Sequence, residues 1–169
     1  SMFEIGQHVI HPGQGVCTVM GIRNDTPSPM LVLHAKTGRA ETHMLYPVAQ
    51  EDRLHQIISR NEAQDLLDHY DDIELDSFTE RNSSLEETHF KQQLKLGAPE
   101  TLRVAKTMRH RIAEAEERGK KPSSYYNRVL KEAHRRSLEE LAVALGLTEE
   151  TCEKRFDEAL HAAHEPTLN

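Results

Sequence analysis

The sequence predicts an α+β protein of two domains, an N-terminal small SH3-like or Tudor-like β-barrel followed by a C-terminal all-α helical bundle. Short apolar runs of strand type alternate with turn residues up to about residue 60. From residue 61 onward, apolar side chains recur at helical spacing, and an acidic run at residues 71–76 follows. We therefore expect a barrel domain at residues 1–60, a short helix with an acidic linker at 61–76, and a helical domain at 77–169.

The predicted barrel begins with a hairpin around Pro12-Gly13-Gln14-Gly15. Proline presets φ in this turn, and the two glycines adopt turn conformations that other residues resist. Further apolar runs lie at residues 30–34 and 41–46, and a short segment at 54–58 can complete the sheet. Four or five strands in so short a stretch bury a core only by curling into a small barrel.

The second half of the chain carries the start and stop signals of several helices. A capping box from Ser84 to Glu87 starts one helix, and Pro99 suits the first turn of the next. Gly146 has the position of a helix C-cap, and Thr148 has that of an N-cap. The predicted helices span residues 61–70, 85–96, 99–118, 123–145 and 148–163.

The charge of the chain is unevenly distributed. The formal net charge is -7, and residues 1–76 alone account for it with five basic and twelve acidic side chains. Residues 101–136 instead carry eleven basic and four acidic side chains. A local positive field suits phosphate binding regardless of distant charge, although a basic outer helix face is also an ordinary solvated surface.

On the helix expected at residues 99–118, apolar side chains cluster on one side, while Arg103, Lys106 and His110 cluster on the other. Such a cationic face can contact phosphate oxygens of a DNA backbone without reading bases. The predicted DNA-binding residues are Lys91, Arg103, Lys106, Arg109, Arg111, Lys120, Lys121 and Arg128.

The sequence offers no convincing catalytic set, so we expect a protein that is not an enzyme and needs no cofactor. Gly13-Gln14-Gly15 is too short for a dinucleotide loop, and adjacent acidic pairs such as Glu149-Glu150 diverge on regular structure. His161 and His164 share a helix face and could hold a metal, but neither a cysteine nor a third histidine is near. A metal site, a small-molecule substrate and catalysis are therefore not expected.

Cysteine content and hydropathy favour a cytoplasmic protein. Cys17 and Cys152 are far apart in sequence, and we expect both to be buried apolar side chains rather than a disulfide. Neither a signal-peptide pattern nor an apolar run long enough to span a bilayer is found, so no membrane role is expected.

Several segments, in their order and spacing, resemble the CarD/CdnL family of bacterial transcription regulators. The likeness is strongest at residues 2–22, and it extends over most of the chain. The N-terminal module of that family shares its fold with a domain of the transcription-repair coupling factor. The further segments that carry the likeness are Met30-Leu-Val-Leu33, Leu45-Tyr46-Pro47, Leu54, Ile57-Ile58-Ser59, Phe90-Lys91, Glu117-Arg118-Gly119, Arg128-Val-Leu130, Ala133 and Glu140-Leu-Ala142.

The resemblance implies binding to the RNA polymerase β subunit by the barrel and contact with promoter DNA by the helical domain, which stabilises the melted promoter complex. It implies that a strand near residues 41–46 adds to a sheet edge of the polymerase. The residues expected to bind RNA polymerase are Thr42, His43, Met44 and Leu45.

One departure from the family pattern affects the predicted mechanism. Family members usually carry a tryptophan just before the aromatic-basic pair that matches Phe90-Lys91, and its ring wedges into the DNA minor groove. This chain has no tryptophan, and Glu86, Glu87 and Thr88 occupy the region. Carboxylates there would repel phosphate. A protein-interaction adaptor on RNA polymerase, without direct DNA contact, is therefore the alternative function.

Overall fold

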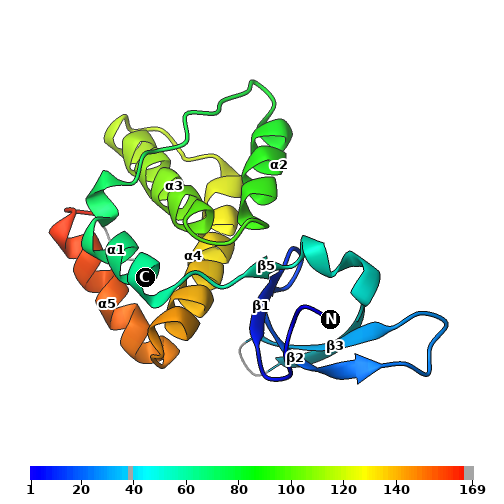
Figure 1. Cartoon of the computed structure of the whole chain (residues 1–169). Helices are drawn as coiled ribbons and strands as arrows, with labels where there is room; N and C mark the ends of the chain where they lie inside the picture. The colour runs from blue at the N-terminus through cyan, green and yellow to red at the C-terminus, as the bar shows by residue number, and fades with distance from the viewer. Residues whose placement is uncertain (38–39, 166–169) are drawn as a thin grey trace. The chain divides into compact units, whose positions relative to one another are not determined.

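A computed structural model describes residues 1–37 and 40–165 of the chain (Figure 1). A five-stranded antiparallel sheet is followed by helices, which confirms the α+β class. The chain divides into two compact units, Ser1–Ile57 and Ile58–Asn169. Each unit has a hydrophobic core of its own, and each is described separately below.

The first unit is built on a sheet with the linear strand order β4-β3-β2-β1-β5. Strands β4 and β5 form its two edges, and no ladder joins them within the described residues. The predicted strands are therefore confirmed, whereas closure of the sheet into a barrel is not. The strands are β1 (His8–His11), β2 (Gly15–Arg23), β3 (Met30–Thr37), β4 (Ala40–Pro47) and β5 (His55–Gln56), with a 3-10 helix η1 (Val48–Arg53) before β5.

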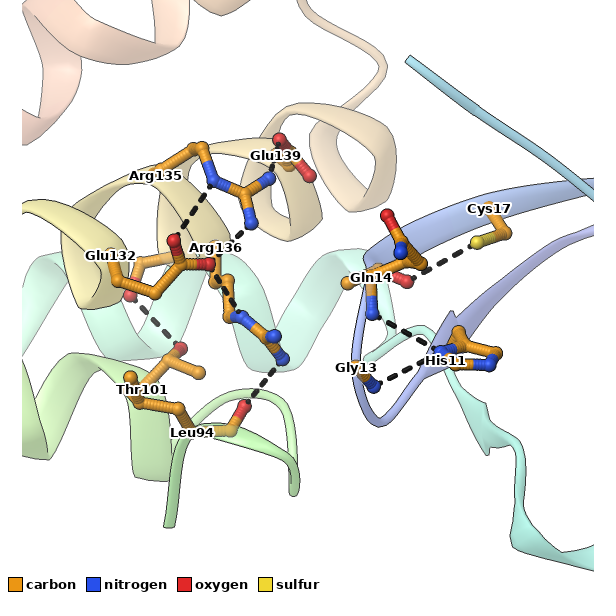
Figure 2. Close-up of polar contacts among 12 residues, drawn as sticks. His11, Gly13, Gln14, Cys17, Leu94, Thr101, Glu132, Arg135, Arg136 and Glu139 are labelled. Atoms are coloured by element: carbon orange, nitrogen blue, oxygen red, sulfur yellow. Dashed lines mark hydrogen bonds and ion pairs between the residues drawn. The ribbon is translucent and has the colours of Figure 1, made fainter. Parts of the chain in front are cut away.

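The turn between β1 and β2 is held by the His11 side chain, whose Nδ1 accepts hydrogen bonds from the amides of Gly13 and Gln14 at 3.0 and 3.1 Å (Figure 2). Gly15 has φ +86°, a conformation that other residues rarely adopt, so the prediction is confirmed for this glycine. Gly13 does not have a positive φ. Alternate side chains of the strands point inward. The core they form contains Phe3, Val9, Cys17, Val19, Leu31, Leu33, Ala35 and Leu54.

The second unit contains all of the α-helices. Within the described residues, none of its helices combines the length and apolarity needed to cross a bilayer. The helices are α1 (Arg60–Asp68), the 3-10 helix η2 (Tyr70–Asp72), α2 (Ser83–Leu94), α3 (Glu100–Glu117), α4 (Ser124–Leu145) and α5 (Glu149–Ala162).

Three helix ends show how far local signals predicted the boundaries. Gly146 is left-handed with φ +67°, and the Thr148 side chain accepts from the amide of Thr151, so both predicted caps are confirmed. The predicted capping box at Ser84 is wrong. The Asn82 side chain instead accepts from the Ser84 amide at 2.8 Å, so α2 begins at Ser83.

The helices enclose two apolar clusters. One cluster joins α1 and η2 to α3, α4 and α5, so the segment at 61–76 contributes Ala63, Leu67 and Tyr70 to the core of the second unit. The other lies among α2, α3 and α4, with Phe90, Met108 and Tyr125 at its centre. Packing of α3 against both clusters leaves little of its surface for solvent.

Candidate protein-docking edge and nucleic-acid interface

Strand β4 lies at one edge of the sheet. One side of β4 pairs with β3 in a register that runs from Met30↔Pro47 to Thr37↔Ala40. Among the described residues, no strand pairs with its other side. An unpaired edge presents a row of backbone N–H and C=O groups to which a strand of another protein can add.

The residues expected to bind polymerase differ in their exposure on this edge. Thr42, His43 and Leu45 are exposed. Met44 is half-buried instead, because it lies opposite Leu33 and packs against the core of the first unit. A partner strand would therefore meet the backbone of all four residues but only some of their side chains.

An exposed apolar pair on the outer face of the sheet was not identified from the sequence. Leu45 is 44% exposed and Met20 is 49% exposed. Val32 lies between their strands, since it pairs with Leu45 on β4 and with Gly21 on β2. A bulge between Val19 and Gly21 shifts the register of β2 against β3. The position of Met20 on this face depends on that bulge, which cannot be predicted from the sequence.

Helix α3 does not carry the continuous cationic face that its periodicity predicts. Arg103 and His110 are exposed as expected. Lys106 and Arg109 are only 4% and 3% exposed, so the prediction that both lie on an exposed cationic face is wrong. The chain that follows α1 packs over this side of α3 and covers both residues.

The Lys106 ammonium group is bound inside the second unit by backbone oxygens. Its Nζ donates to the carbonyl oxygens of Tyr70, Asp71 and Ile73 at 3.1, 2.9 and 2.7 Å. Nζ also lies 5.2 Å from the centroid of the Tyr70 ring. These carbonyls lie at the C-terminal end of the 3-10 helix η2 and in the turn after it. Carbonyl oxygens at a helix C-terminus carry partial negative charge, which favours a cation there.

Arg109 belongs to a second buried polar network. Its Nη1 donates to the Tyr70 hydroxyl at 3.3 Å, its Nη2 lies 3.2 Å from Nδ1 of His134, and its guanidinium lies over the Phe156 ring. The Tyr70 hydroxyl in turn donates to Glu165 at 2.6 Å, and burial raises the pKa of Tyr70. This network ties α3 and η2 to the C-terminal residues and serves the fold.

Arg111 is also occupied by the fold. Its Nη2 donates to the carbonyls of Asp76 and Phe78, and its guanidinium stacks 5.0 Å from the centroid of the Phe90 ring. Nη1 lies 3.6 Å from a carboxylate oxygen of Glu86. The side chain is 14% exposed, so Arg111 adds positive charge near the surface but is not free to move to a ligand.

The basic pair at the centre of α4 is neutralised by neighbouring carboxylates (Figure 2). Arg135 bonds both Glu132 and Glu139, and Arg136 bonds Glu132 and the carbonyl of Leu94 at 3.2 Å. Although burial would raise it, hydrogen bonds from Arg135 and Arg136 lower the pKa of Glu132. These arginines hold α4 together and connect it to α2.

Two further predicted DNA-binding residues, Lys91 and Arg128, are exposed but share one carboxylate. Lys91 Nζ lies 2.9 Å from Glu87, and Arg128 Nη2 lies 3.1 Å from the other oxygen of the same group. The hydrogen bond from Lys91, helped by Arg128, lowers the pKa of Glu87 despite some burial. A phosphate binding here would compete with Glu87 for both cations.

Two predicted DNA-binding residues, Lys120 and Lys121, lie in the loop after α3. Arg118, at the end of that helix, is paired with Glu114 at 2.8 Å. Lys120 and Lys121 are exposed and, with Arg118 and Arg111, line a surface cavity of about 300 Å³. Glu86 and Glu114 also line it. Arg103 lies near the other end of α3, about 21 Å from Glu117 at 1.5 Å rise per residue, so it belongs to a separate surface.

The region that matches the family tryptophan is closed by hydrogen bonds. Glu86 is buried, and it accepts from the Tyr125 hydroxyl at 2.8 Å and from the Glu80 amide at 2.8 Å. Burial and the Glu86 carboxylate raise the pKa of Tyr125. In this region the Glu86 side chain therefore points into the second unit, whereas Thr88 is exposed to solvent.

The N-terminal unit matches a known domain model. Residues 3–58 match the CarD-like/TRCF RID domain. This match covers about a third of the chain, and it supports the resemblance to the CarD-like family. RID domains interact with RNA polymerase, and they are protein-interaction domains rather than catalytic ones. The match covers the sheet with its edge strand β4, and it does not extend into the helices. No curated protein matches the sequence.

Proposed function

We propose that this CarD-like protein is a cytoplasmic bacterial transcription regulator that binds the RNA polymerase β subunit through β4 and contacts promoter DNA through its helical unit. The domain match supports polymerase binding, and the position of β4 at the edge of the sheet supports strand addition as its means. The edge position of β4 is the observation on which the proposal depends.

A pair of proline substitutions tests the edge. Neighbouring residues of an antiparallel strand point their N–H groups to opposite sides of the strand, so the N–H groups of residues 42 and 45 face different sides. One faces β3 and the other faces the unpaired edge. Of Thr42→Pro and Leu45→Pro, one therefore removes a hydrogen bond to β3 and the other removes an N–H group from the unpaired edge. We expect the variant that stays folded to lose binding to an immobilised β-subunit fragment.

Circular dichroism and thermal unfolding identify the folded member of this pair. If that variant is retained by the β-subunit fragment as well as the unmodified chain, strand addition by β4 is refuted. Alanine at the same position as the folded proline variant is the matched control, because it removes the side chain but keeps the N–H group. Only a loss of binding beyond that of the alanine variant reports the backbone donor.

For DNA contact, we propose a surface around the loop after α3. Lys120 and Lys121 are exposed there, with Arg118 and Arg128 nearby in sequence. This surface replaces Lys106 and Arg109, whose cations are buried. Contacts of this kind are to phosphates, so they position the protein on DNA and do not read bases.

The salt dependence of DNA binding by the full chain tests this surface. Each phosphate contact releases counterions, so loss of two lysine contacts in Lys120→Glu with Lys121→Glu should reduce the slope of log K against log salt by about 2. The control, Lys154→Glu with Arg155→Glu, makes the same charge change on exposed positions of α5. An equal slope in both double variants would exclude the proposed surface.

The contacts of Glu87 favour the alternative function, a polymerase adaptor without DNA contact. Both Lys91 and Arg128 are paired with this one carboxylate, which weakens the field available to phosphate. If the chain binds the β-subunit fragment but has no salt-dependent affinity for duplex DNA, the adaptor function stands. Open-complex lifetime on a promoter then reports whether docking alone alters melting.

A further inference from the structure

Three potential metal ligands lie together on the outer face of the sheet. His34 on β3 is the register partner of His43 on β4. Glu41 precedes His43 by two residues, so both side chains point to the same face of β4. The neighbours of His34 along β3, Leu33 and Ala35, are buried in the core, which places His34 on the opposite, outward face.

The geometry of these groups is close to that of a coordination site. The ligand atoms of His34, Glu41 and His43 all lie within 4.8 Å of one another. The two imidazole rings are parallel at a centroid distance of 4.5 Å, and Nε2 of His34 is 3.7 Å from Oε2 of Glu41. Bonds of about 2.0–2.1 Å to a tetrahedral zinc ion place ligand atoms about 3.4 Å apart, so modest side-chain rotations suffice.

The environment of His34 agrees with a ligand role. Its Nε2 is shielded from solvent and has no hydrogen-bond partner among the described residues. Such buried ring nitrogens normally find a partner, and this one is directed to the side where Glu41 lies. An ion pair of a protonated His34 with Glu41 is the competing explanation, and the experiment below separates the two.

We propose that His34, Glu41 and His43 bind one zinc-type divalent ion on the outer face of β3 and β4. Two imidazoles and one carboxylate are a ligand set of zinc, and three protein ligands leave a fourth position for water. Calcium and magnesium prefer sites made of oxygen ligands, so they fit poorly here. The ion would clamp β4 to β3 by side-chain bonds in addition to the backbone ladder.

This inference goes beyond the proposed function, because metal binding is a property of the chain alone. The measurement needs neither polymerase nor DNA, so its outcome is independent of the docking and DNA experiments. Glu41 and His43 lie on the docking strand, however, and occupancy of the site would stiffen the strand that the polymerase is proposed to meet.

Isothermal titration of the full, tag-free chain with zinc chloride tests the site. We expect saturable binding of one ion per chain, weakened at least about tenfold in each of His34→Gln, Glu41→Gln and His43→Gln. Glu41 and His43 are exposed, so their variants should fold, which far-UV circular dichroism verifies.

The control variant is His161→Gln with His164→Gln, which removes two exposed imidazoles from the end of α5 and should leave the titration unchanged. The site is refuted if the unmodified chain shows no saturable binding. It is equally refuted if the three site variants bind zinc as the unmodified chain does, or if only the control variant loses affinity. Zinc would then be bound elsewhere, and His34 and Glu41 would form only an ion pair.

Discussion

Replacement of Lys106 by methionine should destabilise the second unit of the protein, although the side chain keeps its length and apolar stem. The substitution removes one buried ammonium group and its hydrogen bonds to three carbonyl oxygens, those of Tyr70, Asp71 and Ile73. The Tyr70 oxygen keeps its bond from the Ile73 amide. The core packing around the stem stays in place. The measured loss therefore reports the polar contacts of Nζ.

The magnitude follows from the surroundings of the three bonds. A hydrogen bond to a charged group contributes about 1.5–3 kcal/mol, but the desolvation of the ammonium offsets part of the sum. The bonds to Asp71 and Ile73 are only part-buried, so water can reach those carbonyls, whereas the bond to Tyr70 is buried. We expect a net loss of about 2–4 kcal/mol, which lowers the unfolding midpoint by roughly 10 °C.

Urea unfolding followed by circular dichroism measures this loss. Lys131→Met is the matched control, because Lys131 is an exposed lysine on α4, and we expect a change within about 0.5 kcal/mol. The assignment of Lys106 to the core is refuted if Lys106→Met and Lys131→Met unfold at the same urea concentration. A charge reversal at Lys106 would also destabilise the second unit, so it cannot serve as a test of DNA contact.

Three further predictions concern buried groups of the second unit. Both carboxylate oxygens of Glu140 accept backbone amides, at 2.7 and 3.0 Å, so Glu140→Gln should cost about 1–3 kcal/mol in urea unfolding, and no loss would contradict these contacts. Burial would raise the pKa of Asp76, but hydrogen bonds from His89 and a backbone amide lower it. The ionised carboxylate therefore stabilises the folded chain above the ordinary pKa of 3.8, and this contribution is lost as pH falls through the pKa of the folded state. Acid should therefore destabilise the unmodified chain more than Asp76→Asn, and parallel pH profiles would exclude that role. Burial raises the pKa of the Cys152 thiol to about 11, so thiol reagents at about pH 8 should label it only after unfolding, and rapid native labelling would contradict its burial.

The sequence predicted most elements, because their signals are local. Helical periodicity and the caps at Gly146 and Thr148 depend on neighbours within a few residues, and the structure has both. The order and chemistry of residues 2–58 also led to the family whose domain model matches residues 3–58.

The surface predictions failed where a distant segment decides exposure. Periodicity places Lys106 on the polar side of α3, but it cannot indicate that residues 70–73 cover that side and offer carbonyls to the ammonium group. The contact between His34 and His43 similarly depends on the register of β3 with β4, which no local pattern specifies. Asn82 replaced the expected cap for a more local reason, since two adjacent capping signals competed.

The open edge of β4 also has a consequence for chains that have not met a polymerase. A strand that terminates a sheet accepts any compatible backbone, including the same strand of a second copy. Self-pairing grows with concentration, whereas the proposed docking saturates once each polymerase holds one chain. A cell that makes this protein in large excess over its polymerase would therefore drive the surplus toward association with itself.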